Sequence, residues 1–154
     1  MQTKKRLIFC LLYSDGYFCQ SRNFRCQKFG NYNLLFDNYN FLNIGKCRDE
    51  LVILNVTPDL GSYEDFLNNV KRIINNIFIP VTIGGGIRDL KTASACFLNG
   101  ADKIVLNSLL IDRSKTISSV ANTYGSQSIV GCLNYIREGE KIGIFDWRDN
   151  QITN

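Results

Sequence analysis

The chain alternates short apolar runs with longer stretches in which apolar residues recur at helical spacing. The apolar runs predict five strands. They span residues 7–13, 51–56, 78–83, 103–107 and 128–134. The first two runs, "LIFCLLY" and "LVILNV", contain almost no polar residue, which is typical of strands that are buried on both faces.

Helical spacing predicts three helices between the later strands. The first helix covers 63–76, with Ser62 as its N-cap. The second begins after its cap Asp89 and runs through Leu98. The third begins after its cap Asp112, runs through Tyr124 and stops at Gly125. A weaker pattern over 34–40 indicates a short helix, and residues 16–33 read as a polar, aromatic-rich loop.

The strand–helix unit repeats about every 25 residues, which predicts parallel strands joined by right-handed crossovers. The pattern alone fits both a doubly wound sheet and a (β/α)₈ barrel of the TIM type. The tail "REGEKIGIFDWRDNQITN" changes character, and we expect a terminal hairpin at about 136–154 within one domain spanning 1–154.

Composition narrows the function classes. A length of 154 residues suits one domain, and a net charge of +4 lies far below that of nucleic-acid binders. The start "MQTKKRLIFCLLYSDG" lacks a small-residue cleavage site, and we expect neither a signal peptide nor a membrane span.

The cysteines and the lack of histidine limit the chemistry further. No two of the six cysteines have Cys-x-x-Cys spacing, and without histidine we expect no zinc site, no cofactor, and neither a Ser–His nor a Cys–His mechanism within the chain. Cys10, Cys96 and Cys132 lie in apolar runs and are interpreted as core residues. A reducing, cytoplasmic location fits this usage.

Two predicted strand ends carry candidate chemistry. Gly84, Gly85 and Gly86 precede a helix start, where bare backbone N–H groups suit a phosphate, and Asn107 and Ser108 end the next strand with further donors. The alternative is that the glycines only form a tight turn and that Asn107 only caps a helix.

The run from Phe78 to Ser108, "FIPVTIGGGIRDLKTASACFLNGADKIVLNS", resembles the HisF family, the cyclase subunit of imidazole glycerol phosphate synthase. The segments "KKRLIFCLLYSDG", "DELVILNVT" and "YGSQSIVGCLN" match in the same order. The resemblance implies a (β/α)₈ barrel that takes ammonia from a HisH-like glutaminase subunit and acts on a bis-phosphorylated ribulosyl substrate in histidine biosynthesis. It also implies that Gly85, Gly86, Asn107 and Ser108 bind phosphate.

The resemblance fails at the acid–base positions of the family. Leu12 and Asn134 stand where two catalytic carboxylates are expected, Asn55 stands at a third acidic position, and Gln20 replaces a lysine of the first loop. Leucine cannot transfer a proton, and an amide is a poor substitute for a carboxylate. We therefore expect no catalytic residue at these positions. The segment "LLYSDGYFCQSRNFRCQKFGN" looks more like the HisF-like proteins that support amidation of a sugar in surface-polysaccharide (lipopolysaccharide) clusters.

Charged residues before three strands match the ammonia gate of the family. They are Arg6, Glu50 and Lys103, with Asp102 on the partner-facing side, although flanking surface charges are an alternative interpretation.

A full barrel needs about 250 residues, so five strands are expected to leave the first and fifth as exposed edges and the isolated polypeptide poorly soluble or oligomeric. The alternatives to an ammonia-accepting HisF-like subunit are a non-catalytic phosphosugar-binding module and an inactive truncated fragment.

Overall fold

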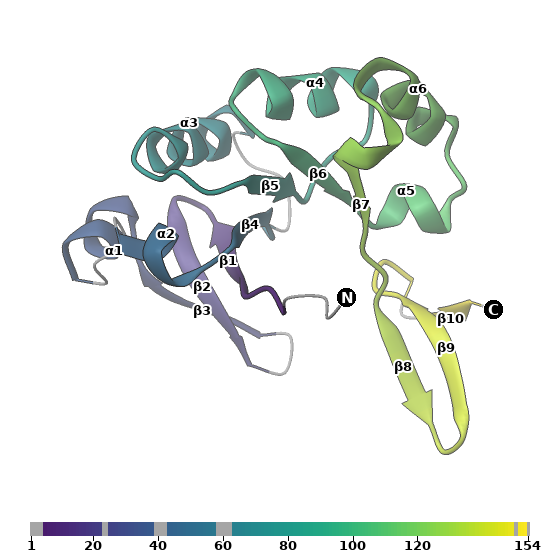
Figure 1. Cartoon of the computed structure of the whole chain (residues 1–154). Coiled ribbons are helices and arrows are strands. Elements are labelled where there is room, and N and C mark those ends of the chain that lie inside the picture. The colour runs from purple at the N-terminus through teal and green to yellow at the C-terminus, as the bar shows by residue number, and fades with distance from the viewer. Residues whose placement is uncertain (1–4, 23–24, 39–42, 58–62, 150, 154) are drawn as a thin grey trace.

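The computed structural model describes residues 5–22, 25–38, 43–57, 63–149 and 151–153. It has a mixed α/β fold built on a seven-stranded sheet (Figure 1). In spatial order this sheet contains β3 (Arg25–Gly30), β2 (Tyr17–Arg22), β1 (Ile8–Ser14), β4 (Glu50–Asn55), β5 (Val81–Gly84), β6 (Lys103–Leu106) and β7 (Ile129–Gly131). The strands β1, β4, β5, β6 and β7 run parallel in chain order, as the sequence predicts.

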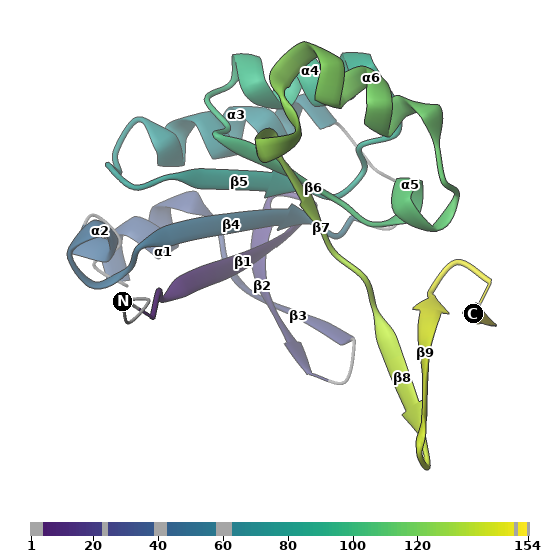
Figure 2. The same ribbon diagram turned by 45° about the vertical axis from the view of Figure 1, so that its right-hand side comes forward.

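Helices lie between the parallel strands, and Figures 1 and 2 show three of them together on one side of the sheet. The helical segments are α1 (Tyr32–Asn38), α2 (Ile44–Cys47), α3 (Tyr63–Ile74), α4 (Leu90–Leu98), α5 (Ser108–Ile111), α6 (Lys115–Tyr124) and the 3₁₀ turn η2 (Ser126–Ser128). The three on one side are α3, α4 and α6. Among the described residues, no helix combines the length and apolar character needed to cross a membrane.

The helix boundaries confirm two predictions and correct one. Asp89 caps α4, because its side chain accepts a hydrogen bond of 2.7 Å from the backbone N–H of Thr92. Gly125 ends α6 with φ 87°. The predicted start at Asp112 is wrong, since Ser114 is the N-cap of α6 and Asp112 ends α5 instead. Ser62 lies outside the described residues.

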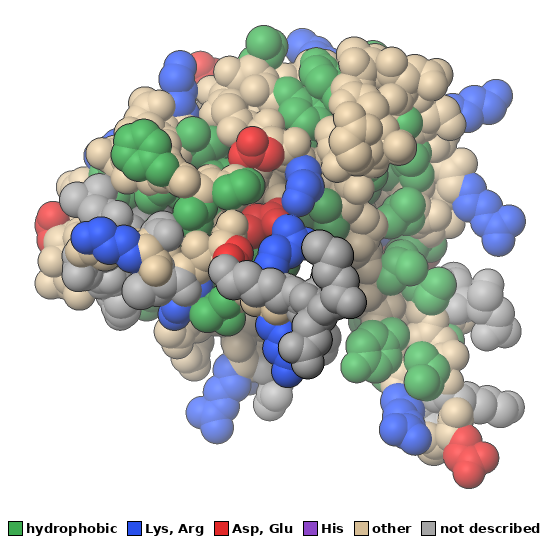
Figure 3. Space-filling model, viewed as in Figure 1, with side chains coloured by type: hydrophobic (Ala, Val, Ile, Leu, Met, Phe, Trp, Pro, Cys, Tyr) green, Lys and Arg blue, Asp and Glu red, His purple; other side chains and the backbone are tan. Residues whose placement is uncertain are grey.

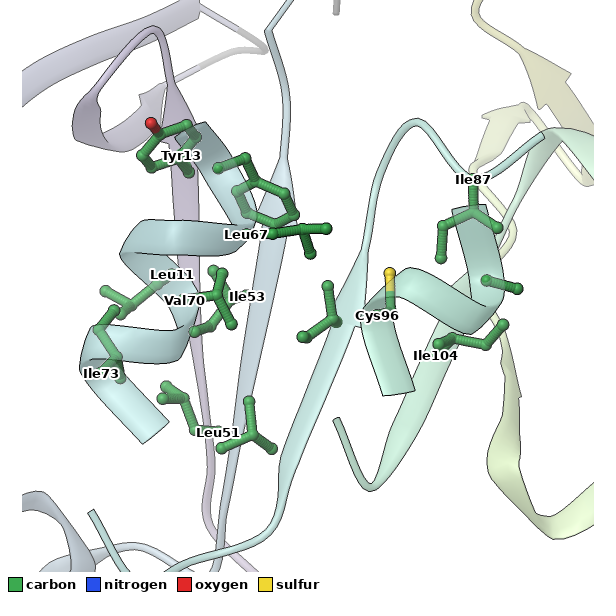
Figure 4. Close-up of a cluster of buried hydrophobic side chains, with 14 of the residues drawn as sticks. Leu11, Tyr13, Leu51, Ile53, Leu67, Val70, Ile73, Ile87, Cys96 and Ile104 are labelled. Carbon is green, nitrogen blue, oxygen red and sulfur yellow. The ribbon is translucent and has the colours of Figure 1, made fainter. Parts of the chain in front are cut away.

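The core lies between the sheet and the helices. Parallel register aligns Leu11, Ile53, Ile83 and Ile104 in one row, and all four side chains are buried. Figure 4 shows Val70 of α3 beside this row. Because each fully buried aliphatic side chain stabilises the fold by about 1.5–3 kcal/mol, this row holds strands and helices together.

The other side of the sheet, which we call the inner face, carries the alternating residues of the same strands. Its rows, read from the register, are Ile8 and Glu50; Cys10, Val52, Thr82 and Lys103; and Leu12, Leu54, Gly84, Val105 and Val130. The expectation that β1 is buried on both faces is wrong, because Ile8 and Cys10 are exposed there. Cys132 is only half-buried, so of the three cysteines interpreted as core residues only Cys96 is buried.

The segment predicted as a loop over 16–33 forms a hairpin instead. Its strands β2 and β3 extend the sheet beyond β1, but β2 pairs with β1 only at Leu12, Tyr13 and Ser14. The first strand is therefore an exposed edge only in its amino-terminal half, and the prediction of a fully open first edge is wrong. The expected strand over 78–83 is also shorter, since it begins at Val81 and leaves Phe78 in solvent.

After β7 the chain forms a separate antiparallel sheet. It contains β8 (Tyr135–Glu138), β9 (Lys141–Asp146) and β10 (Gln151–Thr153), in the order β10-β9-β8. The hairpin of β8 and β9 extends away from the helices (Figures 1 and 2). Hydrophobic side chains gather over it in Figure 3, and Tyr135 and Ile142 are among the exposed ones.

Candidate functional site

The carboxyl ends of the parallel strands bring the predicted glycine and asparagine segments next to each other. Gly85 and Gly86 follow β5, and Asn107 and Ser108 follow β6, its neighbour in the sheet. Both glycines have a left-handed backbone, with φ 84° and 74°. Because side chains disfavour this region, two such residues in succession turn the chain sharply and leave its N–H groups uncovered by a Cβ.

For Gly85, packing alone requires a glycine. A Cβ at this position would lie 2.0 Å from the carbonyl oxygen of Asn55, at the end of β4. Gly84 is similarly confined, because its Cβ would lie 2.7 Å from the Cβ of Val105 on the inner face. The tight-turn interpretation therefore accounts for these two positions, and at Gly86 the left-handed backbone itself favours glycine.

Asn107 is held by the chain itself. Its side-chain Nδ2 donates a hydrogen bond of 2.7 Å to the carbonyl oxygen of Cys132, which ties the end of β6 to the end of β7. Its Oδ1 is buried and has no partner in the described part of the chain. A lone acceptor suits a hydroxyl donor rather than a phosphate oxygen, and the remaining hydrogen-bond donors at this edge are backbone N–H groups and the Ser108 hydroxyl.

The family's acid–base positions carry no ionisable group. Leu12 lies in the same inner-face row as Leu54 and Gly84, and it is half-buried. Asn134 precedes β8, where its carbonyl accepts a hydrogen bond from the backbone N–H of Phe145. Asn55 is buried, and its side chain accepts from the N–H of Thr57. None of these three groups changes charge near neutral pH, so they cannot act as general acids or bases.

A cluster of charges lies at the amino end of the same strands. The Glu50 carboxylate is 3.0 Å from Lys103 Nζ and 3.6 Å from an Arg6 guanidinium nitrogen, and it accepts a hydrogen bond of 2.9 Å from the Thr82 hydroxyl. The Glu50 side chain is 6% exposed, whereas that of Lys103 is 30% exposed and that of Arg6 is 61% exposed. The structure thus brings the three predicted gate residues together around one buried carboxylate.

The environment of Glu50 keeps it ionised. Burial on its own would raise the pKa of this carboxyl, but hydrogen bonds from Lys103 and Thr82, together with the charges of Lys103 and Arg6, lower it below its usual range. A buried carboxylate needs such partners, because removing a charge from water is costly. Asp102, next to the cluster, accepts a hydrogen bond of 2.7 Å from the N–H of Val81 and so joins the starts of β5 and β6.

Two groups of residues were missed by the sequence reasoning. Thr82 is a polar residue within an apolar run, and that signal could have marked it as a partner for a buried charge. Arg148 makes a two-pronged contact of 2.8 and 2.9 Å with Asp112, and it also contacts Asp146. This contact ties the β8–β10 sheet to the end of α5, and residues so far apart in the chain give no sequence signal.

The described residues hold no group of three or more His, Cys, Asp or Glu side chains suited to a metal ion.

Comparisons with known proteins agree with this arrangement. A family model described as "Histidine biosynthesis protein" matches residues 7–154. The chain is 41% identical to the "Putative imidazole glycerol phosphate synthase subunit hisF2" of Parasynechococcus marenigrum (strain WH8102), covering 86% of this chain and 49% of that protein. It is 32% identical to "Imidazole glycerol phosphate synthase subunit HisF" of Chlorobium phaeobacteroides (strain BS1) and of Thermotoga sp. (strain RQ2), each match covering 97% of this chain and 58% of the relative. The chain therefore spans about half the length of the curated relatives it matches.

Proposed function

Because the chain belongs to the histidine biosynthesis protein family, as a homologue of the imidazole glycerol phosphate synthase subunit HisF, we propose that it is the phosphate-binding and ammonia-accepting part of a glutamine amidotransferase system. In this proposal a phosphorylated sugar binds at the carboxyl ends of the strands. A HisH-like glutaminase subunit delivers ammonia to their amino ends, and the setting is the cytoplasm.

The observation that carries the proposal is the pairing of two adjacent strand ends. The left-handed backbone at Gly86 and the start of α5 at Ser108 follow neighbouring parallel strands, and both can present backbone N–H groups to one anion. The unpartnered Asn107 Oδ1 beside them is an acceptor for a sugar hydroxyl. Together they favour a phosphate ester of a sugar over a free inorganic anion.

The charge cluster supports the second half of the proposal. Arg6, Glu50 and Lys103 lie at the opposite end of the inner face from the glycines, where a donor subunit would dock without covering the phosphate end. Between the two ends, the inner face carries small or aliphatic side chains, including Val52 and Leu54. Such a lining can pass a small neutral molecule such as ammonia.

The finer proposal is amidation of a surface-polysaccharide sugar rather than ring closure. Leu12 and Asn134 occupy the acid–base positions, so the proton transfers of the cyclase reaction have no carboxylate here. In an amidation system, a separate amidotransferase would perform the bond-forming chemistry and this chain would supply ammonia. A non-catalytic phosphosugar-binding module is the second candidate, and it is favoured by the same two residues.

Replacing Gly86 by valine is expected to weaken binding of a phosphate ester at least tenfold, which corresponds to about 1.4 kcal/mol. The valine side chain covers the N–H groups of the turn and resists the φ of 74°. Isothermal titration calorimetry with ribose 5-phosphate measures the change. Ser108→Ala, which removes one donor without backbone strain, is expected to weaken binding by a smaller factor.

Gly139→Val is the matched control for the backbone strain, because Gly139 also has a left-handed backbone, with φ 62°, but lies in the turn between β8 and β9. Equal losses of affinity in the two valine variants, with circular dichroism reporting intact folds, would contradict a phosphate site at Gly86. Turnover of the histidine-pathway substrate with ammonium salt would instead favour true cyclase activity over the amidation role.

A further inference from the structure

The β2–β3 hairpin carries two cysteines on one face. Cys19 of β2 lies opposite Lys28 of β3, and Cys26 lies opposite Ser21, so the two cysteines are diagonal neighbours on the same side of the hairpin. Diagonal neighbours across antiparallel strands are close enough for side chains to touch. Both cysteines are free thiols.

We propose that Cys19 and Cys26 form a reversible disulfide, which makes the β2–β3 hairpin a site of redox modification. The proposal rests on the strand register, and it does not depend on the proposed function. No other role accounts for the pair, since neither cysteine belongs to the strand-end site or to the charge cluster.

The hairpin can accommodate the bond. Disulfide-bonded Cα atoms usually lie about 4.4–6.8 Å apart, whereas diagonal neighbours lie about 7–8 Å apart, so the two strands must shift relative to each other to form the bond. The pairing of β2 with β3 shifts register at Phe18 and Cys19, and β2 contacts β1 only over three residues. β3 has no neighbour on its outer side among the described strands. An edge hairpin of this kind can adjust without disturbing the buried row of the sheet.

The exposures of the two thiols assign their roles. Cys26 is exposed, so its thiolate attacks one sulfur of a small-molecule disulfide such as glutathione disulfide, and a glutathione thiolate leaves. Cys19 is buried, and burial is the main reason that its pKa is raised; the neighbouring Cys26 adds to this, and the Lys28 ammonium opposes it. Cys19 then loses its proton and displaces the second glutathione from Cys26. Two protein thiols are oxidised, and one glutathione disulfide is reduced to two glutathiones.

The bond would act next to the strand-end site. Cys19 is the register partner of Leu12, which occupies the acid–base position of the family, and the hairpin carries Gln20. Oxidation would therefore fix β2 to β3 directly beside the carboxyl end of β1. A reduced hairpin keeps only its backbone pairing.

The experiment equilibrates the full chain in glutathione buffers of increasing oxidised fraction, blocks free thiols with N-ethylmaleimide and maps tryptic peptides by mass spectrometry. Trypsin cleaves after Arg22 and Arg25, so Cys19 and Cys26 fall on different peptides that only a disulfide can join. We expect the joined peptide to accumulate with the oxidised fraction and to disappear after dithiothreitol treatment.

Cys10 lies on the same tryptic peptide as Cys19, so the Cys10→Ser variant separates the two. We expect Cys10→Ser to retain the joined peptide at unchanged yield, and Cys26→Ser to lose it while the protein stays folded. Cys26 found only as a glutathione adduct, or a joined peptide that vanishes in Cys10→Ser, would overturn the proposal.

Discussion

Replacing Gly85 by alanine is expected to lower the free energy of unfolding by about 3 kcal/mol or more, which places it among the most damaging single substitutions. Two costs add. Alanine resists the φ of 84°, at about 1–2 kcal/mol, and its Cβ would lie 2.0 Å from the carbonyl oxygen of Asn55. The clash is with backbone atoms of β4, so no side-chain rotation relieves it, and the ends of β4 and β5 must separate.

Gly16→Ala separates the two costs. Gly16 has nearly the same backbone angle, φ 83°, but a Cβ there would meet no atom within 4 Å. Urea denaturation followed by circular dichroism should therefore give a loss of about 1 kcal/mol for Gly16→Ala. A similar loss in both variants would mean that the contact with Asn55 relaxes at no cost, and the packing explanation of Gly85 would be wrong.

This distinction matters for how binding data are interpreted. A Gly85 variant that loses phosphate affinity reports a distorted sheet edge as much as a lost ligand contact. Gly86 is therefore the position chosen for the binding test, with Gly139 as the control for its left-handed backbone. Two residues of the triplet, Gly84 and Gly85, are thus fixed by packing against neighbouring strands.

The parallel sheet and its helices were predictable because their signals are local. The buried row through Leu11 and Ile53 appears in the sequence as apolar runs, and the Asp89 cap predicts the start of α4. Each such signal depends on a few neighbouring residues. The prediction that β1 is buried on both faces failed because an apolar run reveals what a strand could bury, whereas coverage of its inner face depends on other segments.

The hairpin and the site geometry depend on pairings between distant segments. The strands β2 and β3 are exposed along most of their length, so their sequences show no clear alternation, and pairing with β1 decides their structure. Asn107 was expected to offer donors to an anion, but its amide donates to Cys132, a partner that only the packing of β6 beside β7 supplies. Arg6, Glu50 and Lys103 were predicted as an ammonia gate through the family resemblance, while their convergence on Glu50 follows from parallel register.

Replacing Glu50 by glutamine is expected to lower the free energy of unfolding by about 2 kcal/mol at pH 7, since it leaves Lys103 without its counter-charge beside the inner face. Glutamine keeps the size of the side chain and can still accept from Thr82, so the loss measures mainly the charge. Because the pKa of Glu50 is lowered in the folded chain, its carboxylate stabilises the fold above its unfolded pKa of about 4.3, and this contribution is lost as the pH falls through the folded value. The difference between the wild type and Glu50→Gln should therefore shrink in acid.

The double variant Glu50→Gln, Lys103→Met tests whether the pair is coupled. If the unpaired ammonium causes the loss, removing it should restore part of the stability, so the double variant should be more stable than the sum of the single changes predicts. Asp15→Asn is the matched control, because the Asp15–Lys28 pair at 3.3 Å is about half exposed on both sides and should contribute little. If urea denaturation at pH 7 gives Asp15→Asn and Glu50→Gln the same small loss, Glu50 is an ordinary surface charge. The cluster at the amino end of the strands would then lack the buried carboxylate that the proposed ammonia gate requires.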